Sequence, residues 1–220
     1  MENIVILNDG IKQINTDGGR WYQTPEGNRY PSSTSVVSIL NNKAIEQWRQ
    51  TVGNQKADQI CKAASENGSA WHALMEHTIL NGRKTLNFTD KHSAAYSKTL
   101  QIVYPHISDV FAVERTMYSD QCQVAGTSDL IAKWDHVDAI IDWKTASHFK
   151  SKDKIVSYWC QLASYAIMVK ERYDLDIKKL VLVFNVNNGE QVYFYENNNI
   201  EIWKKNFIAL REKFKKLKGF

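Results

Sequence analysis

The segment AIIDWKT, residues 139–145, constrains the fold most strongly, because it combines the composition of a buried strand with two charged residues. Apolar residues surround Asp142, and Lys144 follows two positions later. Side chains alternate along a strand, so Asp142 and Lys144 are predicted to point to the same face. Charged side chains are rarely buried unless they are paired or bind an ion. The segment therefore predicts either a structural salt bridge or the edge of a functional site.

Two further strand-like segments precede this one, at residues 110–119 and 126–134. If the polar residues 135–138 form the turn of a hairpin, Asp129 lies opposite Lys144 and Ile131 lies opposite Asp142. Asp129, Asp142 and Lys144 then share one face, with neighbouring pairs within about 5–8 Å. Two carboxylates and one lysine leave an unbalanced negative charge, which a hard divalent cation neutralises through oxygen ligands.

The rest of the chain predicts helices around this sheet. Helical patterns occupy residues 55–66, 69–80, 91–103 and 154–170, and hydroxyl residues in 32–50 favour a capped helix start. Two strands flank Asn188-Gly189, a strong hairpin signal, and a basic helix is predicted over 199–218. Residues 20–32 predict two short extended pieces around a turn. Because no repeat or linker interrupts the 220 residues, we expect one domain of α/β or α+β class with a central sheet.

Composition excludes several classes of protein. The hydrophobic content of 43% with 24% charged residues is typical of a globular protein, and no apolar run is long enough to span a membrane. The three cysteines are widely separated, which argues against a zinc ribbon and against a disulfide framework. The N-terminal residues 1–10 resemble neither a signal peptide nor a transit peptide, so a cytoplasmic location is expected, in a bacterium or a phage-infected cell.

Positive charge is concentrated near the C-terminus. Residues 204–218 contain seven Lys or Arg residues against Glu212 alone, whereas the whole chain has a net charge of only +4. Apolar residues at near-helical spacing predict that one face of this helix docks on the protein. They are Phe207, Ile208, Leu210, Phe214 and Leu217. The opposite face is either a solvated surface or a contact for a polyanion, for which the candidate residues are Lys213, Lys215, Lys216 and Lys218.

The order of the motifs resembles the core of the PD-(D/E)XK nuclease superfamily, in its RecB-like branch. That branch has Gly-x-x-Asp on one strand, Asp-x-Lys-Thr on the next and Gln-x-x-x-Tyr on the following helix, preceded by a helical Gly-x-x-x-His. The segments YPSSTSVVSIL and VERTMYS add a similarity to the mitochondrial genome maintenance exonucleases and their phage relatives. The resemblance covers about residues 30–165. The matching positions are Gly68, His72, Gly126, Asp129, Asp142, Lys144, Thr145, Gln161 and Tyr165.

The resemblance implies a fold and a set of residue roles. The fold is a central mixed β-sheet flanked by helices, with a helical N-terminal part and a C-terminal basic helix. One or two Mg²⁺ or Mn²⁺ ions are expected, bound by His72, Asp129, Asp142 and the carbonyl of Trp143. Lys144 would position or deprotonate the attacking water and steady the phosphate charge. The remaining candidates are Glu114, for a second metal or for substrate orientation, and Gln161 and Tyr165, for holding the site or contacting phosphate.

The function that this implies is a metal-dependent DNA exonuclease that prefers single-stranded ends, as in DNA repair, recombination or phage replication. A double-strand exonuclease of the phage lambda type, or an endonuclease on the same core, is the alternative enzyme. A non-catalytic nucleic-acid-binding module is a third reading, which the acid–acid–lysine set argues against. Iron–sulfur relatives need four clustered cysteines, so no cluster is expected from the three scattered ones. No P-loop motif is present, so no motor is expected.

Overall fold

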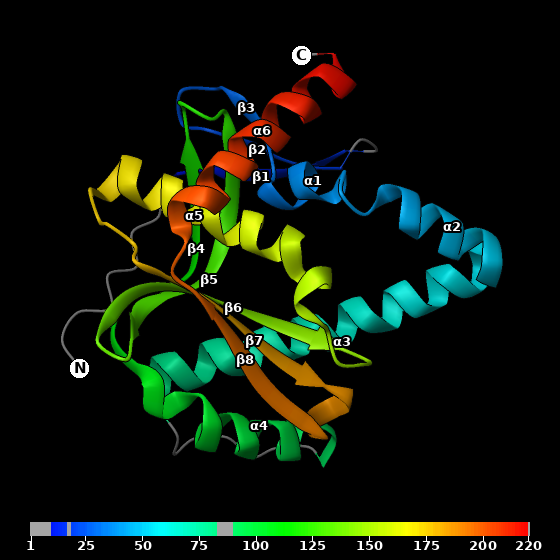
Figure 1. The fold of residues 1–220 in the computed structure, drawn as a ribbon, viewed down its shortest axis with the longest axis vertical. Coiled ribbons are helices and arrows are strands. Elements are labelled where there is room, and N and C mark those ends of the chain that lie inside the picture. The colour runs from blue at the N-terminus through cyan, green and yellow to red at the C-terminus, as the bar shows by residue number, and fades with distance from the viewer. Residues whose placement is uncertain (1–9, 17–18, 83–89, 220) are drawn as a thin grey trace.

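The computed structural model describes residues 10–16, 19–82 and 90–219. The N-terminal residues 1–9, on which the expected location depends, lie outside the described residues. A five-stranded sheet forms the middle layer, with α5 (Val156–Tyr173) and α6 (Ile200–Lys218) above it in Figure 1 and α3 (Asn54–Asn81) and α4 (Asp90–Ile102) below it. The core therefore has two halves, one on each face of the sheet.

The strand order of this sheet is β4-β5-β6-β7-β8. The strands are β4 (Ile107–Ser119), β5 (Val124–Trp134), β6 (Val137–Ala146), β7 (Lys179–Val186) and β8 (Gln191–Asn197). The first three pair antiparallel, β6 and β7 pair parallel across the α5 connection, and β7 and β8 form an antiparallel hairpin. The predicted mixed sheet is confirmed. Short 3₁₀ turns occur at Tyr104–His106, Lys152–Ile155 and Asn187–Gly189.

The central strands are apolar because both of their faces are covered. All eight residues of β7 are buried. In β6, Ile140 packs in the core half beneath α5 and α6, whereas its neighbour Ile141 packs against α3 and α4. A strand that lies parallel to its neighbour between two helical layers needs an almost continuous apolar sequence. This explains why Asp142 and Lys144 are conspicuous in β6.

The N-terminal segment forms a second, three-stranded sheet of β1 (Lys12–Thr16), β2 (Gly19–Gln23) and β3 (Arg29–Pro31). Helix α1 (Ser33–Ser38) follows directly, and the Ser32 hydroxyl accepts a hydrogen bond from the Ser35 N–H at 2.9 Å, which caps the helix as predicted. Ser32 also forms a parallel bridge with Ala125 at the start of β5. The N-terminal segment is thereby attached beside the main sheet.

Helices α2 (Asn42–Val52) and α3 form an arm that projects from the body in Figure 1, and we define the arm as residues 42–66. The two helices are joined at Gly53, whose φ of 83° suits a glycine. The prediction of separate helices at 55–66 and 69–80 is wrong, because α3 continues through Gly68. A glycine costs a helix only about 1 kcal/mol, and burial of Trp71, Met75 and Ile79 farther along the helix outweighs that cost.

Helix α6 packs with a narrower apolar face than the sequence predicts. Phe207 and Phe214 are buried and Leu210 is partly buried against the core, but Ile208 and Leu217 remain 46% and 64% exposed. The predicted docking face is therefore wrong at these two positions. Ile208 lies off the line that runs along the helix from Phe207 through Leu210 to Phe214, whereas Leu217 continues that line but lies in the last turn of the helix. In the described part of the chain, none of the helices has the length and apolar character needed to cross a lipid bilayer.

The β7–β8 turn packs tightly against α4, so Gly189→Ala is expected to destabilise the fold. Gly189 has a φ of 99°, and a Cβ there would lie 2.3 Å from the backbone N of Ala95. Backbone strain and overpacking together should lower the free energy of unfolding by about 2–4 kcal/mol, measured by urea titration. Gly27→Ala is the matched control, because its φ is 91° but its Cβ would meet open space. An equal loss in both variants would show that the contact with Ala95 adds nothing.

Candidate active site

Strands β5 and β6 separate at the point where the two aspartates lie, and we call this separation the fork. The ladder between them runs from Trp134↔Val137 to Leu130↔Ile141. Beyond that pair, β5 continues beside β4 and β6 continues beside β7. Asp129 and Asp142 are the next residue on each prong of the fork. The Asp129 Oδ2 accepts a hydrogen bond of 2.7 Å from the backbone N–H of Trp143, so a side chain replaces the missing ladder bond.

The register that places these aspartates differs from the predicted one. The turn contains only Asp135 and His136, both with positive φ, as in a two-residue hairpin of type I′. Ile131 therefore pairs with Ile140, and the predicted pairs of Asp129 with Lys144 and Ile131 with Asp142 are wrong. The error is a shift of two residues, which leaves every side chain on the same face. Asp129, Asp142 and Lys144 consequently line one pocket.

Asp142 is the most deeply buried charge of the pocket, at 1% exposure. Its Oδ2 lies 2.5 Å from the Nζ of Lys144. Among the described residues, neither carboxylate oxygen accepts a hydrogen bond of acceptable geometry, although both oxygens are shielded from water. A buried carboxylate with spare oxygen lone pairs is costly unless a cation completes its surroundings.

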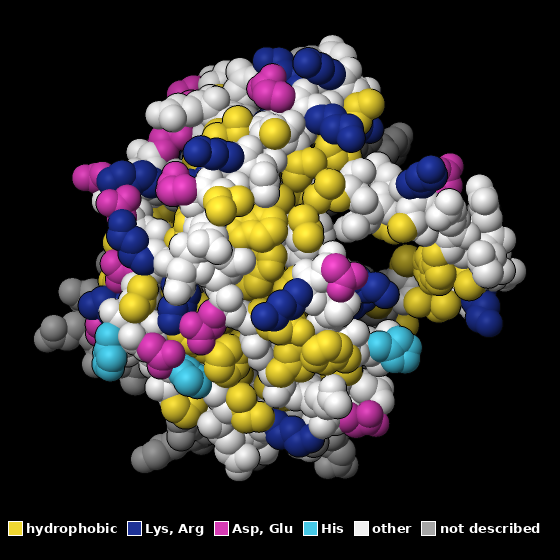
Figure 2. All heavy atoms as spheres, in the orientation of Figure 1, with side chains coloured by type: hydrophobic (Ala, Val, Ile, Leu, Met, Phe, Trp, Pro, Cys, Tyr) yellow, Lys and Arg dark blue, Asp and Glu magenta, His cyan; other side chains and the backbone are white. Residues whose placement is uncertain are grey.

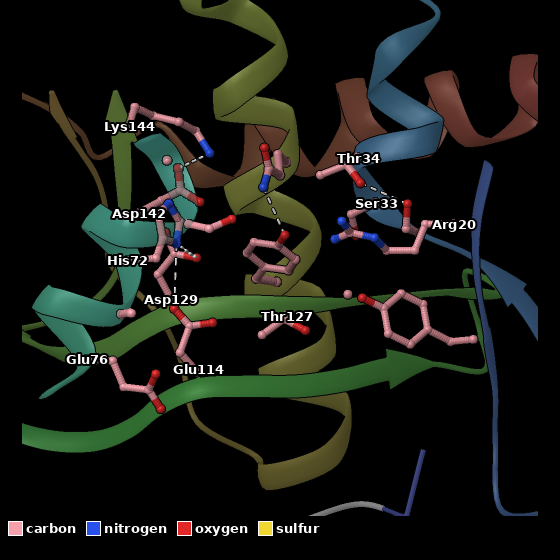
Figure 3. Close-up of a pocket in the computed structure, with 18 residues that line it drawn as sticks. Arg20, Ser33, Thr34, His72, Glu76, Glu114, Thr127, Asp129, Asp142 and Lys144 are labelled. Carbon is pink, nitrogen blue, oxygen red and sulfur yellow. Dashed lines mark hydrogen bonds and ion pairs between the residues drawn. The ribbon is translucent and has the colours of Figure 1, made fainter. Parts of the chain in front are cut away.

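His72 reaches the fork from α3, on the other side of the sheet. Its Nε2 donates a hydrogen bond of 2.9 Å to the carbonyl of Trp143. Its Nδ1 lies 3.5 Å from Asp129 Oδ1 and 3.6 Å from Glu114 Oε1. Figure 3 shows the three side chains pointing toward one another from α3, β5 and β4. His72, Glu114 and Asp129 can each offer one ligand atom within 4.8 Å of the others, which forms a candidate metal centre.

Glu114 occupies a strained position in the middle of β4, with a φ of 44°. Its neighbours Val113 and Arg115 pair normally with Leu130 and Ser128, so the strand keeps its register around the strained residue. A glutamate in left-handed conformation inside a strand costs energy that the surrounding pairs must offset. The strain directs its carboxylate toward His72. Sequence reasoning placed Glu114 in mid-strand but gave no sign of this conformation.

Burial and mutual repulsion shift the pKa values of the pocket. Burial, reinforced by the charge of Asp142, raises the pKa of Asp129 to about 8. Burial lowers the pKa of His72, but Glu114, Asp129 and Asp142 outweigh this effect and raise it to about 9. Burial also opposes the charge of Lys144, yet Asp142 and Asp129 raise its pKa above the usual value. These directions show an excess of negative charge that protons partly balance.

A divalent cation fits this arrangement on two observations. Apart from the Lys144 ammonium at Oδ2, the buried carboxylate of Asp142 has no donor partner in the described ranges, and the His72–Glu114–Asp129 group supplies nitrogen and oxygen ligands of the kind that hard or borderline cations bind. The carbonyl of Trp143 lies beside the same group, 2.9 Å from His72 Nε2. The structure thus brings all four sequence-predicted metal ligands into one place.

Gln161 and Tyr165 line the same pocket from α5. The Gln161 Nε2 donates a hydrogen bond of 2.9 Å to the Tyr165 hydroxyl. Burial and the charge of Asp142 raise the pKa of Tyr165 well above 10, so its hydroxyl keeps its proton. The ring lies against Gly126, where a Cβ would approach Tyr165 to 2.8 Å. The glycine of the Gly-x-x-Asp motif is therefore explained by the close approach of this ring.

Several pocket residues were missed by sequence reasoning. Figure 3 shows Arg20, Ser33 and Thr34 at the end of the pocket opposite the acidic group, whereas Glu76 extends from α3 beside Glu114. The segment that contains Ser33 was interpreted as a helix start and as part of the family resemblance, but Ser33 was not predicted to line the site. Ser33 is also buried, and its hydroxyl accepts a hydrogen bond of 2.8 Å from Ser164 of α5. A single arginine such as Arg20 gives no signal in sequence, because only long-range packing places it here.

Other candidates lie outside the pocket. The four lysines near the end of α6 are not among its lining residues. His136 and Asp176 are exposed, as expected for a turn and a loop. Cys61, Cys122 and Cys160 lie on α3, in the β4–β5 turn and on α5, respectively. The expected absence of an iron–sulfur cluster remains a prediction.

The sequence matches the family described as the PD-(D/E)XK nuclease superfamily over residues 38–217. Because this match covers most of the 220 residues, the chain belongs to the PD-(D/E)XK nuclease superfamily. The fold and the acid–acid–lysine pocket agree with that membership.

Among curated relatives, mitochondrial genome maintenance exonuclease 1 of Xenopus tropicalis is 24% identical over 187 residues, which cover 78% of this chain and 52% of that protein. The Homo sapiens protein of the same name is 26% identical over 129 residues, covering 54% of this chain and 37% of that protein. The chain thus spans about half the length, or less, of these relatives. A crystal structure of a candidate exonuclease from Eubacterium rectale has a TM-score of 0.43 and 11% identity, covering 83% of this chain and 71% of that one.

Proposed function

We propose that this protein is a divalent-metal-dependent deoxyribonuclease that hydrolyses phosphodiester bonds from the ends of single-stranded DNA. In this proposal the chain is a single nuclease domain. The observation that carries the proposal is the pocket of about 450 Å³ in which His72, Glu114, Asp129 and Asp142 converge with Lys144. A binding module for nucleic acid has no need of carboxylates facing a phosphate, because they repel it.

The residue roles follow from charge and position. His72, Asp129, Asp142 and the Trp143 carbonyl would hold Mg²⁺ or Mn²⁺, and Glu114 would hold a second ion or orient the substrate. A bound ion supplies neutralisation of the phosphate, a water of lowered pKa and stabilisation of the leaving oxygen. Lys144, whose raised pKa keeps it charged, would position the attacking water and steady the charge that develops on the phosphate.

The far end of the pocket supports a polyanionic substrate. Arg20, Ser33 and Thr34 offer one guanidinium and two hydroxyl groups there. Guanidinium and hydroxyl groups are common phosphate contacts. Gln161 and Tyr165, which are joined by a hydrogen bond, line the same pocket and would hold the scissile phosphate.

The arm supports the preference for single-stranded ends. Figure 2 shows an open gap between the arm and the body of the molecule. Helix α1, which leads into the arm, and residues 68–76 of α3, which lead out of it, provide opposite walls of the pocket. In this proposal the opening beside the arm is an approach to the pocket. A free end of a flexible single strand can enter such an opening, whereas a duplex is wider and stiffer.

Cleavage of end-labelled DNA tests this function. Single-stranded and double-stranded substrates are incubated with Mg²⁺, with Mn²⁺ and with EDTA, and a covalently closed single-stranded circle is included as the control without ends. We expect cleavage of the linear single strand with either ion, and none with EDTA or on the circle. Cleavage of the circle would identify an endonuclease, and faster digestion of the duplex would identify a double-strand exonuclease. If no substrate is cleaved, the remaining hypothesis is a non-catalytic nucleic-acid-binding module.

The lysines near the end of α6 are expected to add affinity through phosphate contacts outside the pocket. Changing Lys213, Lys215, Lys216 and Lys218 to glutamine should weaken DNA binding and flatten the plot of log affinity against log salt by about 0.7 per lost contact. Arg211 is excluded from this group because it is buried and donates hydrogen bonds to the carbonyl of Gln123.

The measurement is binding of single-stranded DNA across a salt series in EDTA. The matched control neutralises Lys178 and Lys205, which are exposed but lie near the opposite end of α6. Cleavage at saturating substrate should change little, since none of the four lysines lines the pocket. An unchanged salt slope would mean that the lysines form only a solvated helix face.

A further inference from the structure

An exposed aromatic ring lies in the loop of residues 147–151 that follows β6. Phe149 is 57% exposed, although phenylalanine is among the residues most often buried. One side of its ring contacts Tyr193 of β8, with ring centroids 4.9 Å apart and a tilt of 36°. The ring also lies edge-on to Tyr195, with centroids 6.4 Å apart and planes at 70°, and the rest of its surface is exposed to a further ring.

The loop that carries Phe149 is fixed by hydrogen bonds. The backbone N–H of Lys150 donates to the Tyr193 hydroxyl at 2.9 Å, and the Tyr195 hydroxyl donates to the carbonyl of Lys150 at 3.0 Å. Both polar groups of this residue are therefore tied to β8. A ring that is already held in place loses little conformational entropy when a ligand stacks on it.

A continuous series of aromatic rings links Phe149 to the pocket. The Nζ of Lys144 lies 5.1 Å from the ring centre of Tyr158. From there, centroid distances are 6.1 Å from Tyr158 to Phe184, 5.2 Å from Phe184 to Tyr193, and 4.9 Å onward to Phe149. Phe149 is five positions after Lys144, so their Cα atoms are at most about 18 Å apart.

The surroundings of Phe149 carry positive charge. Lys150, Lys152 and Lys154 follow it within five residues, against Asp153 alone. A hollow of about 430 Å³ adjoins the ring and is lined by Lys98, Ile102 and Tyr193 among others. Figure 2 shows apolar side chains gathered over the ends of β6 and β8, with Lys and Arg side chains at their margin. An aromatic surface bordered by lysines matches a nucleobase joined to phosphates.

We propose that Phe149 is a stacking platform for a nucleobase of single-stranded DNA, with the lysines of residues 150–154 contacting the adjoining phosphates. This inference rests on the proposed function, since it concerns the same substrate. A duplex cannot use the platform, because its bases are already stacked and paired. The platform would therefore add to the preference for single strands and would position the strand relative to the pocket.

A double comparison of protein and ligand tests the platform. Binding is measured in EDTA by fluorescence anisotropy for a single-stranded oligodeoxythymidylate and for an abasic strand of the same length, which keeps the phosphates and lacks the bases. Phe149→Ala should weaken binding of the base-containing strand about tenfold and binding of the abasic strand less than about twofold. Phe149→Trp should restore the affinity.

Ile202→Ala is the matched control, because Ile202 is also 57% exposed but lies on α6. It should change neither affinity. Equal losses on the two strands for Phe149→Ala would overturn the stacking platform, as would no loss on either or a failure of tryptophan to rescue. If Phe149→Ala loses affinity only for the base-containing strand but the wild-type protein cleaves no DNA, the stacking platform is supported and the proposed nuclease function is rejected. Cleavage by the wild-type protein without any base-dependent loss would reject the platform alone.

Discussion

Under the proposed function, Asp142→Asn is expected to lower the rate of DNA cleavage by about 10²- to 10⁴-fold, because an ion bound by this carboxylate would supply several kcal/mol of transition-state stabilisation. Asparagine keeps the shape of the side chain but loses the charge that faces both Lys144 and the ion. The fold should survive, since Asp142 is one of three carboxylates crowded around the fork and Lys144 retains Asp129 as an attractive neighbour. Single-turnover cleavage of end-labelled single-stranded DNA, with circular dichroism of the same samples, measures both outcomes.

The matched control for this prediction is Asp176→Asn. Asp176 precedes Lys178 in a second Asp-x-Lys sequence, but it is exposed in the loop before β7. Its substitution should leave cleavage unchanged. Lys144→Ala should resemble Asp142→Asn in activity, with a loss of similar size. Wild-type cleavage by either pocket variant, in preparations free of contaminating nucleases, would contradict the assignment of this pocket as the active site.

Asp129→Asn is expected to reduce the effects of pH and of metal on the stability of the fold. In the metal-free protein, the pKa of Asp129 is raised from 3.8 to about 8, so the folded state binds this proton more tightly than the unfolded state does. Stability from this group is present below about pH 4 and is lost as the pH rises to about 8. The pKa of His72, raised from 6.5 to about 9, adds a loss in the same direction at higher pH.

Mg²⁺ should oppose this loss, because a cation replaces the protons and binds more tightly as they leave. We expect the melting temperature of the metal-free wild type to fall between about pH 5 and about pH 8, and the increase produced by Mg²⁺ to grow over the same interval. In Asp129→Asn both trends should be reduced, and the metal-free variant should be at least as stable as the wild type near pH 8. Asparagine can still accept the hydrogen bond from the Trp143 N–H. A wild-type response to Mg²⁺ in this variant would exclude Asp129 as a ligand.

The sequence predicts the face on which the charged residues lie better than it predicts their partners. The two-residue period of a strand places Asp142 and Lys144 together whatever their pairing, and a shift of two residues brings Asp129 to the same face. The pairing itself depends on the backbone of Asp135 and His136, which adopt left-handed conformations in a tight turn. Nothing in the apolar pattern distinguishes that turn from a longer one, so the face was correct and the register was wrong.

Long-range packing accounts for what sequence reasoning missed. Arg20 and Glu76 reach the pocket only because β2 and α3 lie beside the fork in the folded chain. Arg211 counted as part of a basic tail, yet it is buried and holds the β4–β5 turn through Gln123. Gly68 predicted a break in a helix that tertiary contacts keep continuous. In each case, elements distant in the sequence determine the surroundings of the residue, and the local sequence pattern contains no information about those elements.

If Asp129 and Asp142 bind one ion, the fork makes ion binding and the separation of β5 from β6 linked equilibria. Asp129 belongs to the prong that pairs with β4, and Asp142 belongs to the prong that pairs with β7. An ion held by both carboxylates connects two parts of the sheet that no ladder bond joins beyond Leu130↔Ile141. A contact that favours the narrow state of the fork then raises the affinity for the ion. By thermodynamic reciprocity, the ion strengthens that contact by the same factor. A strand of DNA that touches both prongs would thus tighten the hold on the metal that cuts it.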